Sequence, residues 1–130
     1  MLAVCRVVVS VMKPNVLMVE DEAYLAMALE DLLTDAGYHV LGAARLADAL
    51  EIADHERVDG ALLDINLQGE AVYPLASRLR ERGIPFVFAS AYSERNIPQD
   101  FRDCEIVRKP YTYESIIEAV ESMLEGRKAH

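Results

Sequence analysis

Short apolar runs alternate along this chain with segments in which apolar residues recur at helical spacing. The runs are typical of strands buried in a sheet, and the recurring positions are typical of helices that face a core. The runs predict five strands, at residues 16–19, 38–41, 61–63, 86–89 and 106–107. The periodic segments predict helices at 22–36, around 46–53, around 72–79 and from Thr112 to Leu124. Gly37 and Gly83 each follow one of these helices, in the position that favours a left-handed cap.

The segment between the fourth and fifth predicted strands lacks this regularity. Residues 92–103 contain Pro98 and show little periodicity, so we predict a short or irregular helix there. We also expect few packing anchors in this segment, which makes it the best candidate for a part of the fold that changes shape.

The alternation of strands and helices with short connections is typical of an α/β domain. Right-handed crossovers make successive strands parallel and place helices on both faces of the sheet. We therefore predict an α/β fold with a doubly wound, five-stranded parallel sheet. A length of 130 residues suits one domain. We place this domain at residues 14–127, after an N-terminal extension of residues 1–13.

Composition narrows the range of partners. The net charge of −9 argues against binding to nucleic acid or to an anionic membrane, because both need clustered Lys and Arg. The apolar opening of the chain is too short to span a bilayer and lacks a signal-peptide pattern, so we expect a cytoplasmic protein. Cys5 and Cys104 have no metal-ligand spacing, so neither a zinc site nor a disulfide is predicted.

Five polar residues stand where the predicted strands stop. Glu20 and Asp21 follow the first strand, Asp64 the third, Ser90 the fourth and Lys109 the fifth. Because the carboxyl ends of parallel strands meet at one edge of a sheet, where open α/β folds bind ligands, we expect these side chains to converge.

Three carboxylates in one place predict a divalent cation site. Anions at this density repel one another unless a cation lies among them, and their hard oxygen atoms suit Mg²⁺. We expect Glu20, Asp21 and Asp64 to bind the ion, with the backbone carbonyl of Asn66, in the loop after Asp64, as a further ligand. The alternative for the acidic pair is that Asp21 caps the next helix while Glu20 lies at its positive end.

The same cluster can perform phosphoryl chemistry. An Asp64 carboxylate whose charge is partly neutralised can attack phosphorus and form an acyl phosphate. Lys109 can bind a phosphate oxygen, and the Lys109-Pro110 bond is a candidate cis peptide that would aim the ammonium into the site. Ser90 can donate a hydrogen bond to the phosphoryl group. The alternatives are that Ser90 is a turn residue and that Lys109 is only solvated.

These residues, in this order and on these elements, resemble the receiver domain of two-component response regulators, over about residues 15–124. The resemblance implies a flavodoxin-like (βα)5 receiver fold with strand order 2-1-3-4-5. It implies that Asp64 is the phosphoacceptor, that Glu20 and Asp21 hold Mg²⁺, that Ser90 is the switch hydroxyl and that Lys109 binds phosphate.

The resemblance also implies a role in signalling. The phosphoryl group would come from a histidine kinase or a histidine phosphotransfer protein, and the single-domain regulator would act on a downstream protein target. It would be a monomer or weak dimer that phosphorylates and dephosphorylates itself with Mg²⁺ and is not a turnover enzyme.

One position departs from the family pattern. The family usually has Tyr or Phe two or three positions before the lysine, where this chain has Ile106 and Val107. The stretch IPFVFASAY resembles a subgroup of single-domain receivers that have a phenylalanine-alanine-threonine-glycine-like motif on the fourth strand and also lack this aromatic. Tyr92, just past Ser90, is a candidate for a compensating role.

Other functions are compatible with the same order of layers. A flavodoxin-like electron carrier needs a hydroxyl- or glycine-rich loop after the first strand, and Glu20 and Asp21 would repel the FMN phosphate. A phosphatase of the haloacid-dehalogenase type needs a second Asp two residues after the nucleophile, where this chain has Asn66. The third alternative is a phosphate-independent interaction module of receiver fold, and the intact set of five site residues argues against it.

Overall fold

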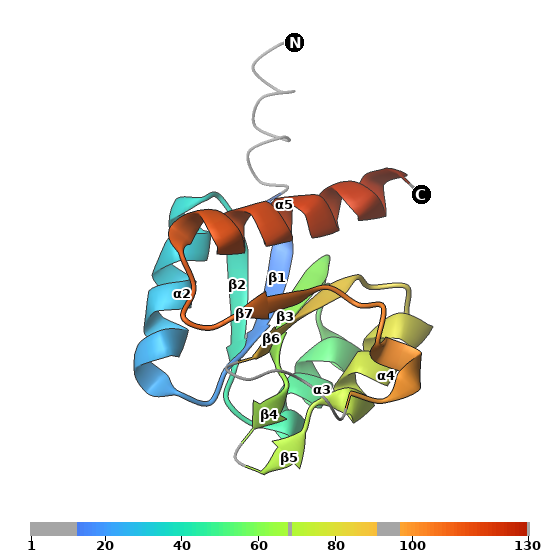
Figure 1. The fold of residues 1–130 in the computed structure, drawn as a ribbon. Helices are drawn as coiled ribbons and strands as arrows, with labels where there is room; N and C mark the ends of the chain where they lie inside the picture. The colour runs from blue at the N-terminus through green and yellow to red at the C-terminus, as the bar shows by residue number, and fades with distance from the viewer. Residues whose placement is uncertain (1–12, 68, 91–96, 130) are drawn as a thin grey trace.

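A parallel sheet forms the centre of the protein and lies between two layers of helices (Figure 1). The computed structural model describes residues 13–67, 69–90 and 97–129. The strands of the sheet are β1 (Asn15–Val19), β2 (His39–Ala43), β3 (Gly60–Asp64), β6 (Phe86–Ser90) and β7 (Ile106–Arg108). The helices are α2 (Ala23–Asp35), α3 (Leu46–His55), α4 (Tyr73–Glu81) and α5 (Tyr113–Ala129). The strands lie in the order β2-β1-β3-β6-β7 and are all parallel, which confirms the predicted sheet and its strand order.

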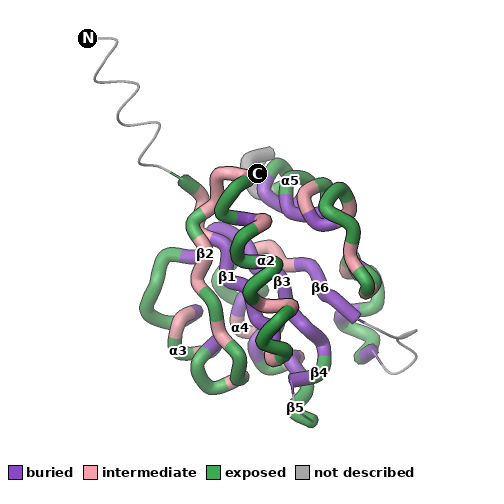
Figure 2. Tube along the Cα trace, turned by 90° about the vertical axis from the view of Figure 1, so that its left-hand side faces the viewer, coloured by how far each residue is buried: buried purple, intermediate pink, exposed green. Residues whose placement is uncertain are grey.

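Side chains of the central strands alternate between the two faces of the sheet, and each face has its own core. Leu17 and Val19 of β1 pack in the layer of α3 and α4, whereas Val16 and Met18 pack in the layer of α2 and α5. Every residue of β3 is buried, because this strand has a neighbouring strand on each side and a helical layer on each face. Figure 2 shows the buried central strands and the exposed outer sides of the helices.

Three predicted helix ends agree with the structure. Gly37 and Gly83 have φ angles of +100° and +71°, which L-residues with a side chain rarely adopt. Thr112 precedes α5, and its hydroxyl accepts a hydrogen bond from the N–H of Ser115 at 3.0 Å. The Ser115 hydroxyl accepts in turn from the N–H of Thr112 at 3.1 Å, so the two residues cap the helix reciprocally.

A small antiparallel hairpin after β3 was not predicted. It consists of β4 (Asn66–Leu67) and β5 (Glu70–Ala71), which are too short to show alternation in the sequence. Asn66 therefore begins a strand and does not lie in a loop, which corrects the prediction of its local structure. Its side-chain oxygen accepts a hydrogen bond from the N–H of Gly69 at 2.9 Å, which helps to close the turn.

The connection between β6 and β7 contains the 3-10 helix η1 (Gln99–Phe101). This element confirms the prediction of a short, irregular helix for the described part of the connection. Residues 91–96, and with them Tyr92, lie outside the described residues. No helix in the described ranges is long and apolar enough to cross a membrane.

The prediction of few packing anchors is wrong for the described part of this connection. Phe101 is buried, stacks on Tyr73 at a centroid distance of 5.7 Å, and makes edge contacts with Phe86 and Phe88. The Arg80 guanidinium lies 4.6 Å from the centroid of the Phe101 ring. Such aromatic and cation–π contacts add to the effect of burial, so one phenylalanine ties η1 to α4 and β6.

Candidate functional site

The predicted site residues all lie at the carboxyl edge of the sheet. Glu20 and Asp21 directly follow β1, Asp64 and Ser90 end β3 and β6, and Lys109 directly follows β7. These four strands are consecutive neighbours, so their carboxyl ends lie side by side. The backbone N–H of Lys109 donates to the carbonyl of Ser90 at 2.8 Å, which extends the pairing of β6 and β7 into the site.

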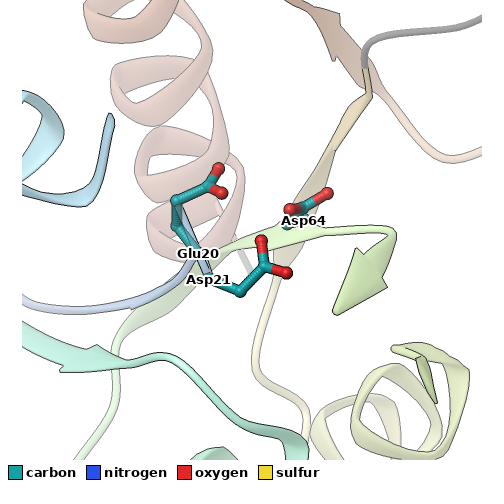
Figure 3. Close-up of side chains that lie close together, drawn as sticks. All are labelled: Glu20, Asp21 and Asp64. Carbon is teal, nitrogen blue, oxygen red and sulfur yellow. The ribbon is translucent and has the colours of Figure 1, made fainter. Parts of the chain in front are cut away.

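Three carboxylates converge where β1 and β3 end (Figure 3). Glu20, Asp21 and Asp64 each offer one carboxylate oxygen, and these oxygens lie within 4.8 Å of one another. Glu20 and Asp64 are 2% and 7% exposed, whereas Asp21 is half-buried and more open to solvent. The described residues contain no second group of three or more His, Cys, Asp or Glu side chains placed in this way.

The first turn of α2 orients Glu20. The N–H of Glu22 donates to Glu20 Oε2 at 3.0 Å, so this carboxylate lies at the positive end of the helix. The N-cap residue of α2 is Glu22, and no side chain makes a capping hydrogen bond there. The alternative in which Asp21 caps the helix is therefore wrong, and its carboxylate is turned to the acidic cluster.

Lys109 is the counter-charge of the buried carboxylates. Its Nζ lies 3.0 Å from Glu20 Oε1 and 3.4 Å from Asp64 Oδ2. Burial alone would lower the pKa of Lys109, but the adjacent Glu20 and Asp64 outweigh burial and raise this pKa. The lysine is therefore an ammonium at neutral pH that is shared between two carboxylates. The Lys109-Pro110 bond that precedes Tyr111 is cis, as predicted.

Asp64 is held in a setting that disfavours its charge. Burial raises the pKa of Asp64 to about 7, the negative charge of Glu20 acts in the same direction, and Lys109 opposes both. The N–H of Asn66 donates to Asp64 Oδ1 at 3.3 Å. A divalent cation would relieve the excess negative charge of the cluster, and three hard oxygen donors at this spacing fit Mg²⁺.

Ser90 and Asn66 stand at the margin of the cluster. Ser90 is 3% exposed and belongs to the strand that pairs with both β3 and β7, so its backbone lies between those of Asp64 and Lys109. The role of Ser90 as a switch hydroxyl and that of the Asn66 carbonyl as a metal ligand stay predictions.

Tyr111 was not predicted as part of the site. Its hydroxyl is buried, and burial, followed by the charges of Glu20 and Asp64, raises the pKa of this phenol. The hydroxyl is therefore a proton donor at neutral pH. The signal available in the sequence was its position two residues after Lys109, which does not reveal where the ring points.

The order and geometry of these residues agree with one family of proteins. Residues 16–121 match the family model of the response regulator receiver domain. The chain belongs to this family. The resemblance inferred from the acidic pair, Asp64, Ser90 and Lys109 is thereby confirmed.

Relatives of the receiver include proteins of different length. This chain is 30% identical over 112 residues to the transcriptional regulatory protein PdtaR of Mycobacterium tuberculosis. The match covers 82% of this chain and 55% of PdtaR. The chain thus spans about half the length of that protein. The sporulation initiation phosphotransferase F of Bacillus subtilis is 26% identical over 118 residues, which cover 87% of this chain and 95% of the relative.

Solved structures show the same fold. The solution structure of SdrG from Sphingomonas melonis Fr1 has a TM-score of 0.76 and 37% identity, covering 86% of this chain and 97% of SdrG. A CheY-like receiver domain protein from Methanospirillum hungatei JF-1 has a TM-score of 0.82 at 20% identity, covering 90% of this chain and 98% of that one. The second likeness supports the fold alone.

Proposed function

We propose that this receiver accepts a phosphoryl group on Asp64 from a histidine kinase or a histidine phosphotransfer protein and signals by binding a protein target. The observation that supports this most directly is the setting of Asp64. It is a buried carboxylate at the end of β3, with oxygens of Glu20 and Asp21 within 4.8 Å and the Lys109 ammonium at 3.4 Å. The match to the sporulation initiation phosphotransferase F covers 95% of that protein. Its name and length support the interpretation of this chain as a single-domain relay protein.

The transfer is a displacement at phosphorus. A carboxylate oxygen of Asp64 attacks the phosphorus of a phosphohistidine, an oxygen–phosphorus bond forms, and the phosphorus–nitrogen bond breaks with its electron pair going to the imidazole. Mg²⁺ bound by Glu20, Asp21 and Asp64 would neutralise part of the charge of the carboxylates and of the phosphoryl oxygens. Water later attacks the acyl phosphate, which releases inorganic phosphate and restores the carboxylate.

The product changes the charges around Lys109 and Ser90. A phosphoryl group adds about −1.5 to −2 charge and three strong acceptor oxygens. The Lys109 ammonium is near enough to exchange Asp64 Oδ2 for a phosphoryl oxygen, and the Ser90 hydroxyl can donate to another. Because Ser90 ends β6 and Lys109 follows β7, both movements would alter the surface that these strands form with α5.

The direct test is to incubate the chain with acetyl phosphate and Mg²⁺. We expect an acid-stable, base-labile label of one phosphoryl group per chain, as an acyl phosphate requires, and no label when EDTA replaces Mg²⁺. If the chain stays unlabelled while another receiver is labelled in parallel, a phosphate-independent role in protein binding becomes the better proposal.

Asp21→Asn should weaken Mg²⁺ binding by about tenfold or more, because the variant removes one anionic ligand from a site with few protein ligands. The change should cost little stability, since Asp21 is half-buried and makes no helix cap. Isothermal titration with MgCl₂ measures the affinity. Asp31→Asn, the same substitution at an exposed position of α2, is the matched control. Equal affinities in the two variants would exclude Asp21 as a ligand.

An apolar groove next to the site is where we infer that the phosphodonor protein binds. The groove has a volume of about 670 Å³ between α2 and residues 109–113, and both Glu22 and Lys109 line it. Tyr24 and Tyr113 also line it, and they are 86% and 55% exposed. A partner bound here would hold its phosphohistidine beside the carboxyl edge of the sheet.

Tyr24→Ala should lower the rate of phosphotransfer from a protein donor by about tenfold, as expected when a large exposed aromatic anchor is lost. The donor in this assay is the autophosphorylated histidine kinase that labels the wild-type chain fastest in a panel. Labelling by acetyl phosphate should be unchanged, because Tyr24 is not part of the acidic cluster. If both donors slow equally, or neither does, the groove is not the docking surface.

A further inference from the structure

Two buried side-chain polar atoms among the described residues lack a hydrogen bond, and both belong to the region of the site. One is Glu20 Oε1, which has only the ion-pair contact to Lys109, and the other is the Tyr111 hydroxyl. Buried polar groups are nearly always hydrogen-bonded, and an exception at a functional site needs an explanation. One of these atoms is an acceptor and the other a donor, so a hydrogen bond between them would satisfy both.

Tyr111 lies next to Lys109 at the edge of the apolar groove. The ring packs against the core cluster that α2 and α5 form on one face of the sheet, and it lines the groove beside Lys109. Burial raises the pKa of this phenol most, and the charges of Glu20 and Asp64 act in the same direction, as expected of a hydroxyl near the acidic cluster. Tyr111 is therefore a protonated donor next to a site that is rich in acceptors.

Glu20 depends on Lys109 for the partner of one of its oxygens. Glu20 Oε2 accepts a hydrogen bond from the N–H of Glu22 at 3.0 Å. Glu20 Oε1 forms an ion pair with the Lys109 ammonium at 3.0 Å. The same ammonium contacts Asp64 at 3.4 Å. When Asp64 bears a phosphoryl group, Lys109 gains stronger acceptors, and Oε1 would lose the Lys109 ammonium as its donor.

We propose that Tyr111 is a positioning residue, whose hydroxyl donates a hydrogen bond to Glu20 Oε1 when Lys109 turns to the phosphoryl group on Asp64. This inference rests on the proposed function. Tyr111 keeps Glu20 oriented toward the cation site at the moment at which its resting partner leaves. In the resting state the Tyr111 hydroxyl has no hydrogen-bond partner. Its removal should therefore destabilise the phosphorylated state and leave the resting state unchanged.

The test is Tyr111→Phe, with Tyr38→Phe as the matched control, because Tyr38 is a half-buried tyrosine at the opposite, amino edge of the sheet. We expect the resting melting temperature of Tyr111→Phe to equal or exceed that of the wild type. The rise in melting temperature with Mg²⁺ and beryllofluoride, a mimic of the phosphoryl group, should be smaller in Tyr111→Phe. Its affinity for beryllofluoride should be at least about fivefold weaker, as the loss of one hydrogen bond to a charged group implies. Tyr38→Phe should match the wild type in its affinity for beryllofluoride and in its gain in melting temperature.

A second experiment does not depend on phosphate. In a Lys109→Met background Glu20 Oε1 has already lost its partner, so the Tyr111 hydroxyl should have turned to it. Tyr111→Phe should then lower the melting temperature of Lys109→Met, although it does not lower that of the wild type, and the double-mutant cycle should show this coupling.

The possible results separate the two proposals. Equal beryllofluoride affinities of wild type and Tyr111→Phe, or the absence of coupling to Lys109→Met, would overturn the role of Tyr111. A resting melting temperature lowered by Tyr111→Phe would also overturn it, because the hydroxyl would then have a structural partner. If the wild type itself gains no stability from Mg²⁺ and beryllofluoride, the proposed function fails, whereas the double-mutant cycle still tests the contact.

Discussion

Asp64→Asn is expected to abolish labelling by acetyl phosphate and by any phosphohistidine donor. An amide oxygen is a poor nucleophile, and Asp64 is a buried carboxylate that ends the central strand β3 and contacts Lys109. The label is measured as acid-stable, base-labile phosphate on the intact chain. Asp31→Asn, on the exposed side of α2, should be labelled like the wild type. A full label on Asp64→Asn would mean that another side chain is the phosphoacceptor.

The same variant should be more stable than the wild type at pH 8 without metal. The pKa of Asp64 is raised from 3.8 to about 7 in the folded protein, so the fold binds this proton more tightly than the unfolded chain does. The contribution of Asp64 to stability is therefore fully present below pH 4 and is lost as the pH rises through 7.

Asparagine cannot ionise and escapes this loss. A shift of this size would correspond to about 4 kcal/mol, which we reduce to about 1–2 kcal/mol because solvent screens part of the charge and the contact with Lys109 is also lost. Urea unfolding at pH 8 and pH 4 measures the difference, which should disappear at the lower pH. Destabilisation of Asp64→Asn at pH 8 would show that Lys109 outweighs burial and repulsion.

Lys109→Met should have the largest effect on the stability of the resting protein. It leaves two carboxylates buried at 2% and 7% exposure without the ammonium that neutralises them. Breaking a buried ion pair in this way is strongly destabilising, and we expect a loss of about 2–4 kcal/mol at pH 8 without metal. Added Mg²⁺ should restore more stability to the variant than to the wild type, because it replaces the missing positive charge.

The functional effect of Lys109→Met should differ from that of Asp64→Asn. Some labelling by acetyl phosphate should persist, because the nucleophile and the acidic cluster are intact. The shifts of amide resonances in β6 and β7 that accompany labelling in the wild type should be lost. Lys13→Met, at an exposed position before β1, is the control for the change of net charge. Normal amide shifts in labelled Lys109→Met would show that another group couples the phosphoryl group to these strands.

The sheet and the positions of its site residues were predictable because both depend on patterns of the backbone. Strands 16–19 and 61–63 are apolar at every position, and the rule that parallel strands end at one edge then brings Glu20 and Asp64 together. The β4–β5 hairpin was missed because strands of two residues have no measurable alternation.

The remaining features depend on where individual side chains point. Phe101 stands among polar residues in the sequence, so its burial against Tyr73 and Phe88 was not visible there. The contact of Lys109 with Glu20, in addition to Asp64, is likewise a matter of a few ångströms that sequence spacing does not define. The orientation of the Tyr111 hydroxyl belongs to the same class.

The burial of β3 along its whole length restricts how a phosphodonor can reach the chain. Both faces and both sides of this strand are covered, and Asp64 at its end is 7% exposed, so little of this side chain is open to a phosphodonor. In the proposed transfer, a donor would therefore offer its phosphorus on the end of a slender, protruding group. An imidazole ring standing out from a helix has that shape, and so does a small molecule such as acetyl phosphate, whereas a phosphate recessed in the donor's own cleft would not make contact.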